Sequence, residues 1–506
     1  MREMTRPVAE RTNIRDLFFV SVKSCPGNLA LLTPEVTLTY AELGLLVSRA
    51  VSHILPKVHG RGDRVAIIGD NHPAYIIGYL ASQSAGIPTV EVGKYESLDR
   101  LETIIDRTQC RFVLTDRQDV VAALKNKVHV ALFAEFMEVL ESADGTSGRR
   151  DIPVSPHDEA SIVFTSGTTN FPKGVMLTHS NFCFIAEVVS QYLNLSADDR
   201  YALILPMSHT YGKSIVLSTI RAGGAIVMIN NFMDLQNFLK ALSEFKCTIL
   251  SAVPYNAHVL LKWGNLSKYD LSALKKMTFS GNKLPASTID RLLELLPWVK
   301  IYSMYGLTES TTRVCYLPPE YLLEKKESCG KPLPGVELKI LDESGQVLPT
   351  GSIGQVFVKG PNVMQCYFQD PELTSQTIVN GWLNTGDLGR LDADGFLYLE
   401  GREKDIIKCA GERISSLEIE EVILNHPEVS EVAIIGAADP VLGEVVHAFV
   451  VPKSASLRLN ELRTYCAKHL SHHKIPRKYT VTNELPKTAT GKIKKHLLRE
   501  EERGNG

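Results

Sequence analysis

Short apolar runs rich in β-branched residues alternate with segments of helical periodicity through the first three hundred residues of the chain. The runs that predict strands lie at 64–69, 111–115, 161–164, 202–205, 225–229, 248–252 and 300–303. Between them, segments such as 74–84 and 288–296 carry apolar residues at helical spacing. This alternation predicts an α/β fold, a doubly wound arrangement in which mostly parallel strands are buried between helices.

The pattern changes after Gly330. Residues 330–400 form short strands separated by Asp, Ser and Gly turns, which predicts a small antiparallel sheet or barrel. Near 401–408 it changes again, to a helix, a strand, a turn, a strand and then a helix over 459–469. We therefore predict an N-terminal core over 1–402, with a β-barrel-like part at about 330–400, and a small mobile α+β domain over 403–506.

Composition excludes several classes of protein. The 506 residues include 55 Lys and Arg against 57 Asp and Glu, a balance that argues against a nucleic-acid binder. The cysteine count of 9 is odd and contains no C-x-x-C pair, which favours reduced thiols over disulfides or a structural zinc site. The polar N-terminus is unlike a signal peptide, and no apolar run is long enough to span a membrane. We expect a cytoplasmic enzyme.

The strongest local pattern is a buried strand that runs into a loop of small hydroxyl residues and glycine. The loop is Thr165, Ser166, Gly167, Thr168 and Thr169, and it is followed by Lys173. Backbone N–H and side-chain O–H groups of this kind surround phosphate oxygens, and the lysine adds charge. The segment is not a Walker A loop, because Pro172 and Gly174 occupy the positions of its Gly and Ser/Thr. Alone, it would also suit a surface turn.

Four further motifs follow in order along the chain. They are Tyr305–Ser310 (YGLTES), Asn384–Asp387 (NTGD), Gly401–Asp405 (GREKD) and Pro486–Lys492 (PKTATGK). Together with the loop, and from about Leu38 to Leu498, they resemble the adenylate-forming superfamily of acyl- and aryl-CoA synthetases, adenylation domains and beetle luciferases. The resemblance implies that a carboxylate attacks the α-phosphorus of ATP, giving an acyl-adenylate and pyrophosphate, and that a thiol then displaces AMP.

The resemblance also implies roles for individual residues. The loop 165–169 and Lys173 would hold the β- and γ-phosphates, Glu309 would help to hold Mg²⁺, and Thr308 would donate to the α-phosphate. Asp387 would accept the ribose hydroxyls, with Arg402 nearby. The adenine pocket would be formed by Gly281, Asn282, Lys283, Tyr305 and Gly306.

The implied roles of the C-terminal part concern catalysis and movement. Lys492 would stabilise the transition state by its charge. Lys404 would lie at a hinge about which this part rotates, and Gly411 would let the backbone approach the pantetheine arm. Asn170 departs from the family's usual glycine, although Asn tolerates the left-handed geometry of such a turn.

The resemblance places the acid pocket around 206–212 (PMSHTYG), with His209 as its aromatic gate. Tyr211 falls near the position where amino-acid-activating domains carry an Asp, which weighs against an ordinary α-amino acid. Another acid, such as Glu91 or Asp234, remains available to pair with a substrate ammonium. The predicted pocket residues are His209, Tyr211, Lys213, Met304, Thr312 and Arg313.

Lys213 and Arg313 are unusual cations for such a pocket. Each needs a partner if it is buried. One hypothesis is a polar or anionic group on the substrate, and the other, which we favour, is a salt bridge to Glu309 or another carboxylate. We expect a small or medium acid: aryl, cyclic (a cyclic amino acid included) or short-chain.

The thiol acceptor is left open between CoA and the phosphopantetheine of a carrier protein acting in trans. The basic run 474–495 would suit either the phosphates of CoA or an acidic carrier, but such runs are more often solvated surface. Two other functions remain as alternatives, namely luciferase-like oxidation of the adenylate and a nucleotide-binding protein without catalysis.

Overall fold

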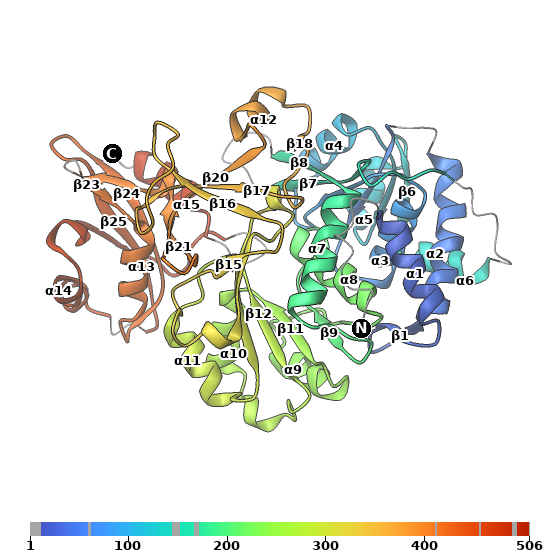
Figure 1. The fold of residues 1–506 in the computed structure, drawn as a ribbon, viewed down its shortest axis with the longest axis horizontal. Helices are drawn as coiled ribbons and strands as arrows, with labels where there is room; N and C mark the ends of the chain where they lie inside the picture. The colour runs from blue at the N-terminus through green and yellow to red at the C-terminus, as the bar shows by residue number, and fades with distance from the viewer. Residues whose placement is uncertain are drawn as a thin grey trace. The chain divides into compact units, whose positions relative to one another are not determined.

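The computed structural model describes residues 12–58, 62–143, 152–165, 172–409, 412–454, 457–487 and 493–504. The chain divides into two compact units (Figure 1). The first comprises Met1–Lys326, Pro332–Glu337 and Lys359–Leu383, and the second comprises Glu327–Lys331, Leu338–Val358 and Asn384–Gly506. The small sheet after Gly330 therefore groups mainly with the C-terminal part. The predicted boundary at 402/403 concerns a movement and stays a prediction.

The first sheet is nine-stranded and mostly parallel. Its order is β15 (Lys331–Pro332), β14 (Cys315–Leu317), β13 (Lys300–Tyr305), β12 (Lys276–Phe279), β11 (Ile249–Ala252), β9 (Arg200–Leu203), β10 (Ala225–Met228), β1 (Leu29–Leu32) and β2 (Thr37–Thr39). Strands β1 and β9–β13 pair parallel with one another, whereas β2 is antiparallel to β1 and β14 is antiparallel to β13.

The second sheet is seven-stranded. Its order is β18 (Cys366–Tyr367), β8 (Lys173–Thr178), β7 (Glu159–Thr165), β4 (Thr89–Val92), β3 (Arg64–Ile68), β5 (Cys110–Thr115) and β6 (His129–Leu132). Strands β3–β7 are mutually parallel, and β8 returns antiparallel to β7. Buried strands of this kind read as continuous apolar runs, as the sequence indicated.

Helices cover both sheets of the first unit. They are α1 (Ile14–Ser24), α2 (Tyr40–Ile54), α3 (Pro73–Ser84), α4 (Leu98–Arg107), α5 (Gln118–Leu124), α6 (Phe133–Ser142), α7 (His179–Tyr192), α8 (Thr210–Ala222), α9 (Leu235–Glu244), α10 (Pro254–Trp263), α11 (Ala286–Leu295) and α12 (Pro371–Thr377). Helices α1, α3, α7 and α8 pack on one another between the sheets (Figure 1). This arrangement confirms the predicted α/β class with buried parallel strands.

The second unit holds two small sheets. The first has the order β16 (Glu337–Leu341), β17 (Gly354–Lys359), β20 (Trp382–Leu391) and β19 (Ile378–Val379), and β20 is antiparallel both to β19 and to β21 (Leu397–Arg402). The second has the order β23 (Glu412–Ile414), β22 (Ile407–Cys409), β25 (Gly443–Pro452) and β24 (Val429–Asp439), with β26 (Lys478–Val481) beside β25.

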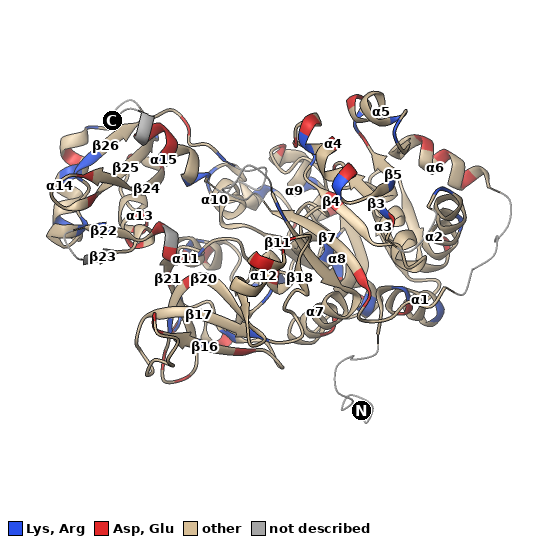
Figure 2. Ribbon diagram, turned by 90° about the horizontal axis from the view of Figure 1, so that it is seen from above, with Lys and Arg blue, Asp and Glu red and all other residues tan. Residues whose placement is uncertain are grey.

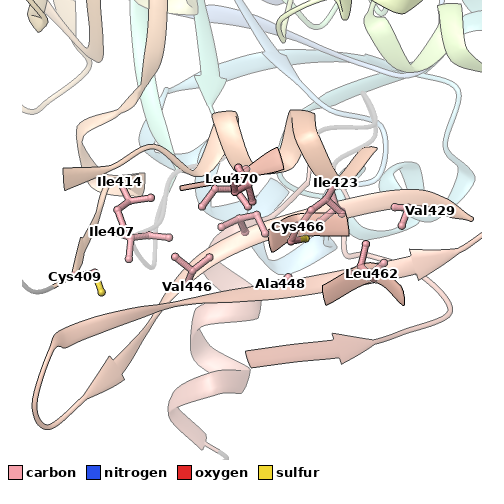
Figure 3. Close-up of a cluster of buried hydrophobic side chains, with 14 residues drawn as sticks. Ile407, Cys409, Ile414, Ile423, Val429, Val446, Ala448, Leu462, Cys466 and Leu470 are labelled. Carbon is pink, nitrogen blue, oxygen red and sulfur yellow. The ribbon is translucent and has the colours of Figure 1, made fainter. Parts of the chain in front are cut away.

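The helices of the second unit are α13 (Ser416–Leu424), α14 (Leu459–His469) and α15 (Lys495–Gly504). The order α13, β24, β25, α14 is the predicted helix, strand, strand and helix. Figure 3 shows the core that they form, in which Ile423 and Leu462 from the two helices meet Val446 and Ala448 of β25.

Local chemistry sets the ends of several helices. Thr39 caps α2 in a capping box with Glu42, in which each side chain bonds the other residue's backbone N–H. Gly223 ends α8 at a φ of 72°, where a residue with a side chain would be strained.

Among the described residues, no helix is long and apolar enough to cross a bilayer. In Figure 2, Lys and Arg are interspersed with Asp and Glu on the helices.

We expect Ile423→Ala to destabilise the C-terminal part by about 2–5 kcal/mol, because Ile423 is 0% exposed and truncation leaves a cavity. Hydrogen exchange of the β24 and β25 amides measures this opening free energy. The matched control is Leu424→Ala, since Leu424 is 41% exposed and should change the same amides by less than about 0.5 kcal/mol. Equal effects of the two substitutions would contradict this account of the core.

Candidate active site

Two adjacent parallel strands bring the predicted nucleotide-binding segments to one edge of the nine-stranded sheet. β12 and β13 pair in register from Lys276 with Lys300 to Phe279 with Ser303, so their carboxyl ends lie side by side. Gly281 follows β12 at a φ of 97°, which favours glycine, and Tyr305 closes β13 almost wholly buried. Asn282 is exposed and Lys283 half-buried beside them. This is the edge at which open α/β sheets bind ligands.

Tyr367 joins two residues that are far apart in the sequence, Lys173, predicted to bind phosphate, and Glu309, predicted to hold Mg²⁺. Its hydroxyl donates a hydrogen bond to Glu309 Oε1 at 2.8 Å, and Lys173 Nζ lies 5.4 Å from the centre of its ring. Tyr367 belongs to β18, which pairs with β8, the strand that begins at Lys173. A lysine offers charge to phosphate oxygens, and a carboxylate is the ligand that Mg²⁺ prefers. The three side chains thus suit a polyphosphate with its cation.

The segment from Gly306 to Thr312 is held in a strained conformation. Thr311 and Thr312 have φ values of 50° and 78°, a region that β-branched residues avoid. Thr312 N donates to Leu307 O at 2.9 Å, and Thr311 Oγ1 donates to Asn362 O at 2.7 Å. The turn packs so tightly on Gly306 that a Cβ there would overlap the Thr312 carbonyl. Thr308 and Glu309, in the 3-10 helix η3 (Thr308–Ser310), are fixed by this turn.

The start of α8 carries two of the predicted acid-pocket residues. His209 precedes the helix, and its N–H donates to Pro206 O at 3.1 Å. Burial and, to a lesser extent, the charge of Lys213 together lower the pKa of His209 to about 4, so the imidazole is neutral at pH 7. The Tyr211 hydroxyl shares a hydrogen bond of 2.9 Å with Thr278 Oγ1 of β12. A neutral imidazole at this place is better suited to contacting an organic acid than to carrying a positive charge.

Lys213 pairs with Glu91 of β4. Nζ lies 2.8 Å from Glu91 Oε2, both side chains are 0% exposed, and the rings of Tyr79 and Phe182 flank the ammonium. Burial lowers the pKa of Lys213, and Glu91 opposes that shift. The salt-bridge interpretation of Lys213 is therefore confirmed. The suggestion that Glu91 could serve a substrate ammonium is wrong, because its charge is matched inside the protein. Asp234, the other candidate, caps α9 by accepting from Asn237 N at 3.3 Å.

Arg313 contrasts with Lys213. It is 1% exposed, its guanidinium lies 4.9 Å from the centre of the Tyr211 ring, and its Nη2 donates to Ser214 Oγ at 3.2 Å. Nη1 contacts the sulfur of Met304. In the described part of the chain no carboxylate lies within ion-pair distance of it, and Glu309 bonds Tyr367 instead. The favoured prediction of a salt bridge is therefore wrong for Arg313.

Asp387 and Arg402 lie opposite each other on paired strands of the second unit. They are register partners in β20 and β21, and Arg402 Nε donates to Asp387 Oδ1 at 2.9 Å. Asp387 N in turn donates to Thr385 Oγ1 at 3.1 Å, which fixes the turn at Gly386. A fixed, almost buried carboxylate beside a cation is chemically suited to accept ribose hydroxyls, the role that the resemblance implies.

Several predicted site residues lie outside the described residues. They are Ser166, Gly167, Thr168, Thr169 and Asn170 of the phosphate loop, and Gly411 and Lys492 of the C-terminal part. Lys404 lies in the 3-10 helix η5 (Glu403–Asp405). The segment before Lys492 is anchored by Lys487, which pairs with Glu431 at 2.6 Å, and the segment after it by Lys495, which pairs with Glu420 at 2.7 Å.

Sequence reasoning missed Tyr367 and Asn362 and misassigned Glu91. Glu91 had a recognisable pattern, since an acid inside the run Thr89–Val92 needs a buried partner. Tyr367 and Asn362 follow no motif. The pairing of β18 with β8 brings Tyr367 to the site, and hydrogen bonds with Thr311 and Arg313 hold Asn362 there.

Comparison with known proteins gives a consistent family. The chain matches the model of the AMP-binding enzymes over residues 18–368 and that of the AMP-binding enzyme C-terminal domain over 418–492. It is 34% identical over 477 residues to the 2-succinylbenzoate–CoA ligase of Bacillus cereus strain AH820, covering 94% of this chain and 96% of that one.

Solved structures agree with this family. The o-succinylbenzoate CoA synthetase of Bacillus subtilis, in complex with its acyl-adenylate intermediate, has a TM-score of 0.87 at 29% identity, covering 97% of this chain and 98% of that one. ATP-bound MatB from Rhodopseudomonas palustris has a TM-score of 0.86 at 28% identity, covering 97% and 99%.

We expect Lys213→Met to destabilise the protein by about 3–5 kcal/mol, because it leaves the Glu91 carboxylate buried without a partner. The double variant Lys213→Met, Glu91→Gln should recover most of that loss. Guanidinium unfolding followed by tryptophan fluorescence measures both. A double variant as unstable as the sum of its parts would show that the pair contributes nothing as a pair.

We expect Gly306→Ala to lower the rate of the reaction at this site roughly 100-fold, because the new methyl group displaces the turn that holds Thr308 and Glu309. Gly93→Ala is the matched control, since nothing lies within 4 Å of a Cβ there. Steady-state kinetics of the two variants test the expectation, which fails if both retain the wild-type rate.

Proposed function

Given that the chain belongs to the family of AMP-binding enzymes and is an AMP-forming acid–thiol ligase, we propose that it activates an aromatic carboxylic acid with ATP and transfers the acyl group to the thiol of CoA. The observation that carries this proposal is the group formed by Lys173, Tyr367 and Glu309 at the carboxyl edge of the sheets. The names of the relatives, 2-succinylbenzoate–CoA ligases, support both the aromatic acid and CoA.

The first step forms a bond between the acid's carboxylate oxygen and the α-phosphorus of ATP, while the bond from that phosphorus to pyrophosphate breaks. Lys173 neutralises the departing phosphates, and Thr308 orients the α-phosphate. Lys492 stabilises the charge that develops on it without transferring a proton. This step needs positioning and charge rather than covalent help from the protein.

Glu309 is the residue that would hold Mg²⁺. Its carboxylate is a hard oxygen ligand and is oriented by the Tyr367 hydroxyl through one oxygen only. A bound Mg²⁺ supplies charge that polarises the phosphoryl oxygens. A structure of the Bacillus subtilis relative holds ATP and a magnesium ion, which supports this assignment.

The second step breaks the bond between the acyl carbon and AMP as the thiol sulfur attacks that carbon. We propose that residues 403–506 move as a body between the two steps, about a hinge at Lys404, and that Gly411 then faces the pantetheine arm. Asp405, next to the hinge, pairs with Arg499 of α15 at 2.6 Å. This pair ties the hinge to the helix that follows Lys492, so that the catalytic loop travels with it.

CoA is favoured over a carrier protein as acceptor. Four of the six lysines of the basic run have an acidic partner in the second unit: Lys474 with Glu418, Lys478 with Glu502, Lys487 with Glu431 and Lys495 with Glu420. A run of which these four lysines are neutralised offers less free charge to an acidic protein.

The proposal includes a cytoplasmic location. All nine cysteines are free thiols, which supports a reducing compartment.

We expect acid-dependent exchange of pyrophosphate into ATP with an aromatic acid such as 2-succinylbenzoate, followed by a CoA thioester detected by mass spectrometry. Lys492→Ala should lower the exchange rate by about 10²–10³-fold, because it removes a charge that acts in the transition state. Lys468→Ala, an exposed lysine of α14, is the matched control and should leave the rate unchanged. No exchange with any acid of a broad panel would overturn the proposed function.

A further inference from the structure

A cavity of about 530 Å³ lies in the first unit, where the loops that follow β1, β3 and β10 meet helices α6 and α9. None of the residues that line it belongs to the predicted nucleotide or acid pockets. The three loops leave the carboxyl ends of parallel strands, two from the nine-stranded sheet and one from the seven-stranded sheet. Carboxyl ends of this kind are where open α/β sheets bind ligands, and the volume suits a small molecule.

The wall of the cavity between the two sheets is held by Asn71, a residue that is 7% exposed. Its carbonyl oxygen accepts a hydrogen bond of 2.9 Å from Nδ2 of Asn230, which lines the cavity. Its side chain donates to Leu205 O at 3.0 Å and accepts from Met207 N at 2.9 Å. Because these bonds join the loops after β3, β9 and β10, the cavity is preformed, which reduces the ordering that a ligand must bring about.

Apolar side chains form most of the lining. Met137 of α6 and Met228 of β10 contribute thioethers, and Phe245 contributes a ring at the end of α9. Thioethers adapt to the shape of a ligand and make favourable contacts with aromatic rings. The lining therefore suits an apolar body, and an aromatic one above all.

The polar atoms of the lining are mainly hydrogen-bond acceptors. Glu35 and Glu141 supply carboxylates, and neither has an ion pair with a Lys or Arg among the described residues. Asn230 and Asn237 spend an amide N–H on acceptors of the protein, at 2.9 and 2.7 Å. Their side-chain carbonyl oxygens are left for a ligand that donates hydrogen bonds.

No basic side chain balances these acceptors. Among the described residues that line the cavity there is no Lys or Arg, and the one His is His72. Its ring stacks on Phe133, with the ring centres 5.2 Å apart, and its Nδ1 accepts from Ala74 N at 3.1 Å. Burial lowers the pKa of His72, although Asp116 and Glu35 oppose the shift, so the imidazole adds no positive charge at pH 7.

We propose that this cavity is a binding site for a small organic cation, an aromatic amine that is protonated at pH 7. Its ring packs among Met137, Met228 and Phe245, and its ammonium group pairs with the carboxylates of the lining. The same carboxylates repel a carboxylic acid, so the cavity is not a second place for the substrate. The inference does not depend on the proposed function.

The test compares three ligands that share a naphthyl ring and differ in charge. They are 2-(naphthalen-1-yl)ethylamine, 2-(naphthalen-1-yl)ethanol and naphthalen-1-ylacetate, each titrated into the full-length enzyme and followed by ligand-observed NMR. We expect the amine to bind with a Kd below about 1 mM. It should bind about fivefold more tightly than the alcohol and about tenfold more tightly than the acetate, because only the amine pairs with the carboxylates.

Two variants locate the amine, each with a matched control. Ala241→Trp fills the cavity from α9 and should abolish binding, whereas Ala122→Trp, at an exposed position of α5 outside the cavity, should leave the Kd unchanged. The double variant Glu35→Gln, Glu141→Gln should weaken the amine about fivefold and leave the alcohol unchanged. Glu138→Gln removes another exposed acid of α6 that does not line the cavity, and it should change neither ligand.

Selective binding of the amine that is lost in Ala241→Trp supports the proposal. Equal affinity for amine and alcohol, binding that survives in Ala241→Trp, or no binding up to about 10 mM overturns it. If the melting temperature shows that Ala241→Trp does not fold, the double variant decides, and an unchanged preference for the amine overturns the proposal. Displacement of the amine by ATP with 2-succinylbenzoate would place it in the acid pocket and overturn the proposal too.

Discussion

Helix α8 is fixed from two sides, and the geometry of the candidate site depends on this. The Lys213–Glu91 pair ties the helix to β4 of the seven-stranded sheet, and the Tyr211–Thr278 hydrogen bond ties it to β12 of the nine-stranded sheet. Both bonds are buried, where an unmatched charge or hydroxyl is expensive, so the helix has one favourable position between the sheets. His209 and Ser214 take their places from that position.

The distribution of charged side chains follows from the same free-energy cost of burying an unmatched charge. With 55 basic and 57 acidic side chains, the chain can pair most of its charges locally, and it does so in the basic run near the C-terminus and at Arg64. An enzyme that handles ATP needs positive charge at a few points rather than over a whole surface. In the proposed function Lys173 is such a point, and both it and Glu309 contact Tyr367.

Much of the fold was predictable because buried parallel strands and amphipathic helices leave periodic patterns. The helix at 459–469 was placed to the residue, whereas the predicted strand at 202–205 lies two residues earlier, at Arg200–Leu203. The short strand Thr89–Val92 escaped notice because Glu91 interrupts its apolar run. Partners of buried charges were not predictable, since Glu91 and Lys213 are brought together by two sheets whose packing no local pattern records. Tyr367 reached the site for a similar reason, through the pairing of β18 with β8.

The turn between β13 and β14 contains two features that disfavour folding, namely strained backbone and a buried cation. Two consecutive threonines in left-handed backbone, and an arginine for which the described residues offer no carboxylate, each cost free energy, although the Thr311 hydroxyl donates a stabilising hydrogen bond to Asn362 O at 2.7 Å. Glycine at 311 or 312 would remove the strain, and methionine at 313 would remove the charge. Since the turn also holds Thr308 and Glu309, its rigidity fixes the position of these two residues relative to Arg313. The free energy spent on the strained backbone therefore goes into a rigid turn that holds Thr308 and Glu309 in place.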